Sequence, residues 1–73
     1  MAFVAMQPLN SSNLKAAGFD PETGTLVVEF RSGKSYSWIG VTQDVYDDLM
    51  AAESPGRFFN SNIAGRFDRG DIA

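Results

Sequence analysis

Residues 25–41 constrain the fold most, because they read as two strands joined by a tight turn. Apolar residues alternate with others along Thr25–Phe30, as in a strand that buries one face, although Val27 breaks the alternation. The second strand is predicted over residues 34–41 and carries the triplet Tyr36-Ser37-Trp38. We expect one face of the hairpin to gather Leu26, Val28, Phe30, Tyr36 and Trp38.

The register of this hairpin depends on the length of its turn. A two-residue loop would shift the pairing by one residue and turn every side chain to the other face. We predict a three-residue loop over residues 32–34, which pairs Phe30 with Tyr36. Val28 then lies opposite Trp38, and the apolar residues stay together.

Turn and cap residues divide the rest of the chain. A first strand over residues 14–19 ends at an Asp-Pro turn that closes on Gly24. Thr42 is a good N-cap for a helix over residues 43–52, and a Ser-Pro-Gly sequence begins a second helix over residues 56–63. Three antiparallel strands followed by two short helices predict an α+β domain with the helices on one sheet face.

The length of 73 residues suits one domain. We expect an N-terminal arm or edge strand over residues 1–9, the domain over residues 10–67 and a tail over residues 68–73. No apolar run reaches the ~20 residues that cross a bilayer, and residues 1–8 lack the basic region of a secretory signal. We therefore expect a cytoplasmic protein without a membrane partner.

Cysteine and histidine are both absent, which excludes disulfides, thiolate metal sites and the commonest general base. The serines sit at predicted turns and caps without an activating base. We therefore predict no enzymatic activity, no metal and no cofactor. A hydrolase or nuclease that uses carboxylates and a metal is a remote alternative, which loss of turnover in EDTA would support.

The net charge of −3 and the pI near 4.5 bear on the partners. Proteins that bind duplex nucleic acid without sequence preference are usually basic, because affinity comes from neutralising phosphates. We therefore predict no duplex DNA partner. A pocket can be locally positive in an acidic protein, so a small nucleotide is favoured over a long polymer.

Short motifs spread over most of the chain carry a family resemblance. In chain order they are Ser11-Ser12, Gly18-Phe19-Asp20, Leu26-x-Val28-x-Phe30, Ser32-Gly33, Tyr36-Ser37-Trp38, Val45-Tyr46, Leu49, Ser54-Pro55-Gly56, Phe58-Phe59-Asn60, Ile63 and Arg66-Phe67. In their order and spacing the chain resembles the KTSC domain family. That domain occurs at the C-terminus of some lysyl-tRNA synthetases and in free-standing small bacterial and phage proteins.

The resemblance implies RNA binding, which is the usual suggestion for the family, and it implies no aminoacylation, because the synthetase core is absent. Three positions depart from the family pattern. Trp38 stands for a second Tyr, Thr42 for a Pro and Phe67 for a final Tyr. A role that needs the two missing phenolic hydroxyls is therefore not expected here.

Two groups of residues are candidates for a binding site. Tyr36, Trp38 and Phe67 fit a platform on which a base stacks, although the hydrophobic core is the commoner place for residues such as Tyr36 and Trp38. Arg57, Asn60, Asn62 and Arg66 fit a phosphate site near the second helix, or solvated surface residues.

We therefore expect a non-enzymatic binding module for a phosphate-bearing ligand. The ligand is either a nucleotide, a class that includes cyclic signalling nucleotides, or a short single-stranded RNA. The alternative is a protein-interaction or homo-oligomerisation module. Its signals are the apolar arm Phe3-Val4 with Met6, and the unexplained Val27 and Ile39. The two functions are compatible, since a homo-oligomer can build a ligand pocket at its interface.

Overall fold

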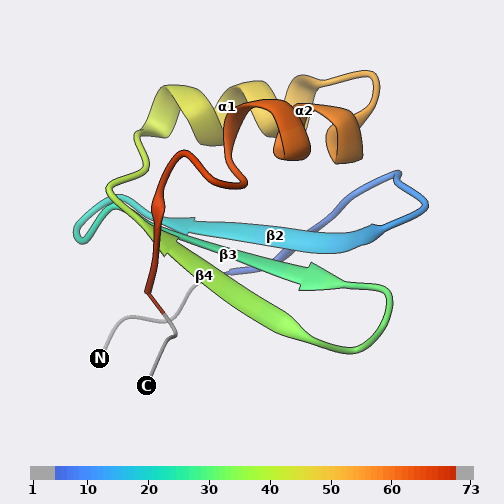
Figure 1. Ribbon diagram of the computed structural model, residues 1–73, viewed down its shortest axis with the longest axis horizontal. Coiled ribbons are helices and arrows are strands. Elements are labelled where there is room, and N and C mark those ends of the chain that lie inside the picture. Colours follow the sequence, from blue (N-terminus) through green and yellow to red (C-terminus); the bar gives the residue numbers. More distant parts are fainter. Residues whose placement is uncertain (1–4, 71–73) are drawn as a thin grey trace.

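The computed structural model describes residues 5–70, which form a five-stranded antiparallel sheet with two helices packed on one face (Figure 1). The strands follow one another in the same order along the chain and across the sheet. They are β1 (Gln7–Pro8), β2 (Leu14–Asp20), β3 (Thr25–Phe30), β4 (Ser35–Ile39) and β5 (Asp68–Arg69). Helices α1 (Gln43–Ala51) and α2 (Pro55–Asn62) lie between β4 and β5 in the chain. The predicted α+β class and the two helices are confirmed.

The predicted number of strands is wrong, because the sheet has five strands and not three. The additional strands β1 and β5 contain two residues each, which is too short for an alternating pattern to be seen. Pro8 also makes a strand less expected from the sequence, because proline has no N–H to donate to a neighbouring strand. It is tolerated here because β1 is an edge strand. Phe3 and Val4 of the predicted arm lie outside the described residues.

The register of the central hairpin differs by two residues from the prediction. Val28 pairs with Tyr36, and the N–H of Phe30 donates to the carbonyl of Lys34 at 2.8 Å. The loop therefore covers residues 31–33, with Gly33 as its last residue at a φ of 95°. Three-residue hairpin loops favour a glycine in this left-handed conformation at their end, which fixes the register. A shift of two residues preserves the faces, so the predicted apolar face is still formed.

A β-bulge in β2 decides which of its residues face the helices. The pairing with β3 shifts by one residue between Leu14 and Ala16, so Lys15 is the extra residue. Leu14 and Ala17 are an odd number of residues apart, yet both are fully buried in the core. Lys15 is exposed, and its Nζ lies 3.8 Å from the carboxylate of Glu29 on the opposite face. The bulge therefore keeps a charged residue out of the core.

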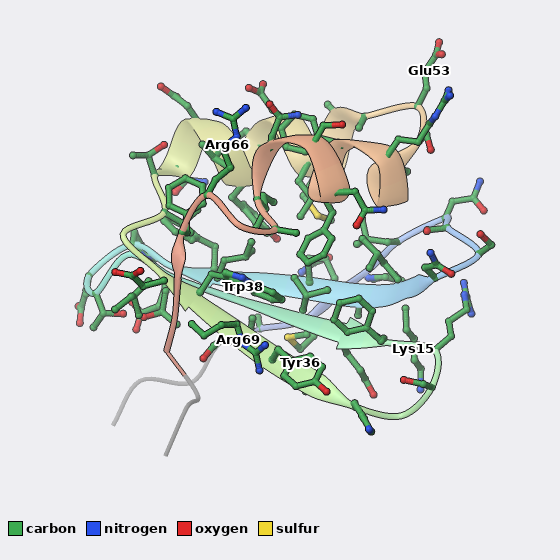
Figure 2. All side chains as sticks on the ribbon, in the orientation of Figure 1. Lys15, Tyr36, Trp38, Glu53, Arg66 and Arg69 are labelled. Atoms are coloured by element: carbon green, nitrogen blue, oxygen red, sulfur yellow. The ribbon has the colours of Figure 1, made fainter. Side chains whose placement is uncertain are left out.

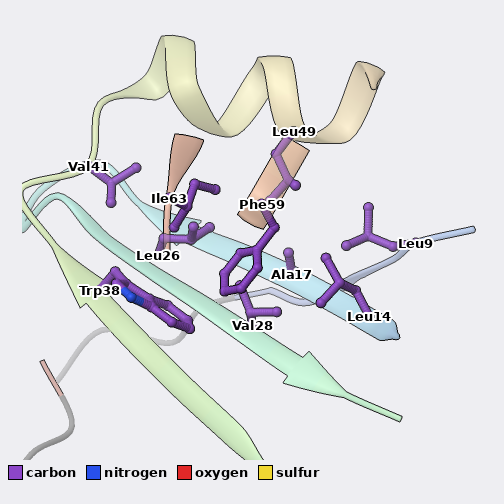
Figure 3. Packing of buried hydrophobic residues seen from close by; sticks show 10 residues of the cluster. All are labelled: Leu9, Leu14, Ala17, Leu26, Val28, Trp38, Val41, Leu49, Phe59 and Ile63. Carbon is purple, nitrogen blue, oxygen red and sulfur yellow. The ribbon is translucent and has the colours of Figure 1, made fainter. Parts of the chain in front are cut away.

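The core fills the space between the sheet and the two helices (Figure 3). Leu49 of α1 and Phe59 of α2 point toward the hairpin, together with Ile63 at the end of α2. The buried hydrophobic cluster consists of Leu9, Leu14, Ala17, Leu26, Val28, Trp38, Val41, Leu49, Phe59 and Ile63. Both helices begin and end within one residue of the predicted bounds.

Cap residues behave differently at the two helices. The Oγ1 of Thr42 accepts a hydrogen bond from the N–H of Val45 at 3.4 Å, as predicted for an N-cap. Ser54 precedes α2, but among the described residues its side chain accepts no capping hydrogen bond. Within residues 5–70, neither helix is long and apolar enough to span a membrane.

Candidate functional site

The predicted site residues fall into different places in the structure. Tyr36, Trp38 and Phe67 line one pocket, which we call the aromatic pocket. It has a volume of about 340 Å³ and is lined by Phe30, Tyr36, Trp38, Phe59, Ala64, Gly65, Phe67 and Arg69. Arg57 and Asn60 line a second pocket of about 260 Å³, which we call the polar pocket.

Burial separates the two aromatic residues of β4. Trp38 is 5% exposed and packs edge-on against Phe59, with ring centroids 5.0 Å apart. Tyr36 is half-buried and contacts Phe30 edge-on at a centroid distance of 5.8 Å. Trp38 is therefore a core residue that forms the floor of the aromatic pocket, while Tyr36 stands at its rim.

Arg69 of β5 lies over the aromatic rings of β4 (Figure 2). Its guanidinium carbon is 4.0 Å from the ring centroid of Tyr36 and 5.4 Å from that of Trp38. These distances are those of cation–π contacts, which are stronger where the site is partly desolvated. The contact places a permanent positive charge at the rim of an apolar pocket.

The polar pocket lies between the turn before β2 and the start of α2. Its lining residues are Asn10, Ser11, Ser12, Asn13, Glu53, Ser54, Pro55, Gly56, Arg57 and Asn60. The Oγ of Ser11 is already used, because it accepts hydrogen bonds from the N–H groups of Asn13 and Leu14, each at 3.2 Å. The pocket also combines one arginine, Arg57, with one carboxylate, Glu53, so its charges oppose each other.

Asn62 and Arg66 lie outside the linings of both pockets described here. The Nδ2 of Asn62 donates to the carbonyl of Phe58 one turn earlier in α2, at 3.2 Å. Arg66 is exposed in the turn after α2, which contains Gly65 at a φ of 78°. The four predicted phosphate-binding residues are therefore not gathered into one site, since only Arg57 and Asn60 share a pocket.

Arg69 was not predicted to line a pocket, because residues 68–73 were predicted to form a tail. The spacing of Arg69 from Phe67 is the one sequence signal for its position. Side chains two residues apart in an extended segment share a face, so Arg69 follows Phe67 on the pocket side. The pairing of Trp38 with Arg69 fixes this arrangement.

Tyr46 has a raised pKa but lies outside the linings of both pockets. Burial raises the pKa of the Tyr46 hydroxyl above its ordinary value of 10.0, and the charge of Asp47 adds to this effect. Tyr46 stacks on Phe19, away from both pockets, with ring centroids 5.6 Å apart. Within residues 5–70, no group of three or more carboxylates is placed to hold a metal ion.

Comparison with known proteins identifies the family of this fold. The family model of the KTSC domain matches residues 10–67. The chain belongs to the KTSC domain family. The crystal structure of a KTSC domain protein from Yersinia pestis superposes with a TM-score of 0.90 at 34% identity, covering 97% of this chain and 100% of that one.

Two relatives show how KTSC domains occur. A protein of Tsukamurella paurometabola is 47% identical over 62 residues, which are 85% of this chain and 92% of that protein. A lysine–tRNA ligase of Nostoc punctiforme is 37% identical over 67 residues, which are 92% of this chain and 12% of the ligase. The KTSC domain thus occurs both in proteins of similar length and as a small part of a large one.

Proposed function

We propose that this KTSC domain is a non-enzymatic module that binds a phosphate-bearing ligand, either a nucleotide or a short single-stranded RNA. The observation that carries the proposal is the aromatic pocket with Arg69 at its rim. An aromatic surface receives the base, because every base has a π-face. The positive charge beside it attracts the phosphate.

The size of the aromatic pocket supports a ligand of this class. A volume of about 340 Å³ lies at the lower end of the roughly 300–1,000 Å³ typical of small-molecule sites. Its apolar lining favours a flat apolar group such as a base, and Phe67 and Tyr36 remain half-buried at its edge. A single nucleotide unit matches this volume better than a stacked pair.

The polar pocket is an additional phosphate contact in this proposal. Its α2 terminus has amide groups without a side-chain cap at Ser54, and these attract anions. Glu53 lines the same pocket as Arg57, and its negative charge weakens that attraction. We therefore assign the main share of the affinity to the aromatic pocket.

The relatives favour RNA among the phosphate-bearing ligands. The ligase of Nostoc punctiforme carries a similar segment, and tRNA is the substrate given in its name. The net charge of −3 favours a short ligand, since tracking a long backbone requires many cations.

The test is fluorescence anisotropy with a short fluorescein-labelled oligo(U) at about 50 mM and about 200 mM salt. We expect saturable binding that weakens with salt, and displacement by unlabelled oligo(U) but not by duplex DNA. Competition with a mononucleotide and with a cyclic dinucleotide separates the ligand sizes. If neither the oligonucleotide nor either nucleotide binds at protein concentrations up to about 1 mM, the proposal is wrong.

A second candidate function is protein interaction or homo-oligomerisation. It is supported by Ile39 and Met6, which are 43% and 36% exposed, and by the two-residue edge strands β1 and β5. Strand addition at an open edge would be the mode of contact. Analytical ultracentrifugation tests it: a concentration-dependent dimer that Ile39→Lys dissociates supports this function, and a monomer at all concentrations contradicts it.

A further inference from the structure

We infer that the indole N–H of Trp38 donates a hydrogen bond to a carbonyl oxygen of the bound base. This bond makes the aromatic pocket select a base over an apolar ring of the same shape. The inference rests on the proposed function and identifies the group that recognises the base. It gives Trp38 a polar role in addition to its place in the core.

The indole nitrogen is the polar group on the floor of the aromatic pocket. Among the described residues that line this pocket, hydrogen-bond donors are carried by the side chains of Tyr36, Trp38 and Arg69. Tyr36 and Arg69 are half-buried at the rim, whereas Trp38 is 5% exposed. A ring that enters the pocket fully is therefore in contact with the indole.

The indole N–H is open to an acceptor that enters the pocket. Within residues 5–70, Trp38 contacts the rings of Tyr36 and Phe59 and the guanidinium of Arg69, and its indole makes no hydrogen bond. No side-chain nitrogen or oxygen in that part of the chain is both enclosed and without a partner. The indole nitrogen therefore reaches a surface, and the surface that Trp38 lines is the aromatic pocket.

The position of the Trp38 ring is fixed by its neighbours. Its backbone pairs with Leu26 of β3 and with Arg69 of β5. The ring of Phe59 meets it at 80° with centroids 5.0 Å apart, and that of Tyr36 at 69° and 6.5 Å. Because the indole cannot turn without disturbing these contacts, its N–H has a fixed direction. A donor held in place loses little entropy when the ligand binds.

A fixed donor on the floor separates ligands by their chemistry. An indole N–H can donate but cannot accept, so the ligand must supply the acceptor. Uracil has two carbonyl oxygens at its edge and can supply one. An apolar ring of the same shape would cover the donor and leave it without a partner, which costs more than an average hydrogen bond contributes. The apolar walls thus provide affinity for flat rings, and Trp38 provides the discrimination.

The first experiment uses the unmodified protein. Trp38 is the single tryptophan, so its indole N–H gives one signal in a proton–nitrogen correlation spectrum. The protein is titrated with oligo(U) and with an oligonucleotide of equal length in which difluorotoluene, a ring of the same shape and a poor acceptor, replaces each uracil. We expect oligo(U) to move the indole proton downfield, as for a donor that gains a hydrogen bond. The substituted oligonucleotide should not do so, and it should bind about fivefold to a hundredfold more weakly.

Two variants assign this discrimination to one residue. Trp38→Phe removes the indole N–H and keeps an aromatic ring, and we expect it to bind the two oligonucleotides equally tightly. Tyr36→Phe is the matched control, because it removes only the hydroxyl of a rim residue of the same pocket. Its ratio of the two affinities should stay within about twofold of that of the unmodified protein. A general loss of packing cancels in this ratio, and far-UV circular dichroism checks the fold of each variant.

The outcomes distinguish this inference from the proposed function. If the protein binds oligo(U) while the indole proton does not move downfield, or if the substituted oligonucleotide binds as tightly, the inference is overturned and the proposed function stands. If Tyr36→Phe and not Trp38→Phe removes the discrimination, the inference is also overturned. These titrations of the unmodified protein decide the question even if Trp38→Phe does not fold.

Ligand size does not leave the inference untested. If a mononucleotide or a cyclic dinucleotide binds and oligo(U) does not, the indole signal is followed with that nucleotide, and the same downfield movement is expected. If the unmodified protein binds none of the nucleotide probes, both the inference and the proposed function fail.

Discussion

Tyr36 and Trp38 lie two residues apart on β4 and point to the same face, but their surroundings differ. Trp38 is next to Phe59 of α2, whose ring meets it at an angle of 80°. Tyr36 is nearer the hairpin turn, where Phe30 and Arg69 are its neighbours. The same strand therefore supplies one residue to the core and one to the pocket rim.

Burial should decide the cost of truncating a side chain. Ile63 is fully buried between the helices and the sheet, whereas Ile39 is 43% exposed. We expect Ile63→Ala to reduce the free energy of unfolding by about 2–5 kcal/mol, because it leaves a cavity. Ile39→Ala should change it by about 0.5 kcal/mol or less. Urea unfolding of both variants measures the difference, and equal losses would contradict the assigned core.

Tyr46 should make stability sensitive to alkaline pH. Its folded pKa is raised above 10.0 by burial and by Asp47, so the folded state favours the neutral phenol. The contribution is fully present below pH 10 and is lost as pH rises through the folded pKa. We expect the unmodified protein to lose more stability than Tyr46→Phe between about pH 8 and about pH 11. Urea midpoints at both pH values check this, and parallel losses would contradict it.

The helices begin in two different ways, which a pair of cap variants can separate. Thr42→Ala removes the bond to the N–H of Val45 and should cost about 0.5–1 kcal/mol, given its length of 3.4 Å. Ser54→Ala should cost less, because the Ser54 side chain makes no capping bond within the described residues. Thermal unfolding of the two variants gives the comparison. A larger loss for Ser54→Ala would show that its hydroxyl caps α2 after all.

The elements that could be predicted are those long enough to carry a pattern. The alternation in β3 and the cap and apolar spacing of α1 indicated their type and nearly their bounds. The strands β1 and β5 exist because neighbouring strands offer unpaired backbone groups, not because of their own composition. Such strands depend on tertiary context, and this is why the position of Arg69 beside the aromatic pocket was not predicted.

The predicted phosphate site likewise depended on tertiary structure that the sequence pattern does not show. Arg57, Asn60 and Arg66 are close in sequence, but the turn at Gly65 changes the chain direction after α2. Arg66 is not part of the polar pocket, which Arg57 and Asn60 line. Proximity in sequence around a short helix was therefore not enough to predict which residues line one pocket.

As a whole molecule, the domain should unfold in one cooperative step. A chain of 73 residues buries only about 60% of the surface of its unfolded state, so its stability should be modest. Trp38 is the single tryptophan and joins the sheet to α2, so its fluorescence reports on tertiary packing. We expect its urea transition to coincide with that of far-UV circular dichroism. An earlier fluorescence transition would show that the pocket region unfolds separately.

The bulge at Lys15 has a consequence for how relatives of this chain are aligned. Lys15 is one residue more than the pairing with β3 requires. A chain that lacks it would keep Leu14 opposite Phe30, as it is here, but without a bulge. Leu14 would still face the helices, so the core would be unchanged. A gap of one residue at this point in an alignment therefore marks a difference in strand length and not a difference in fold.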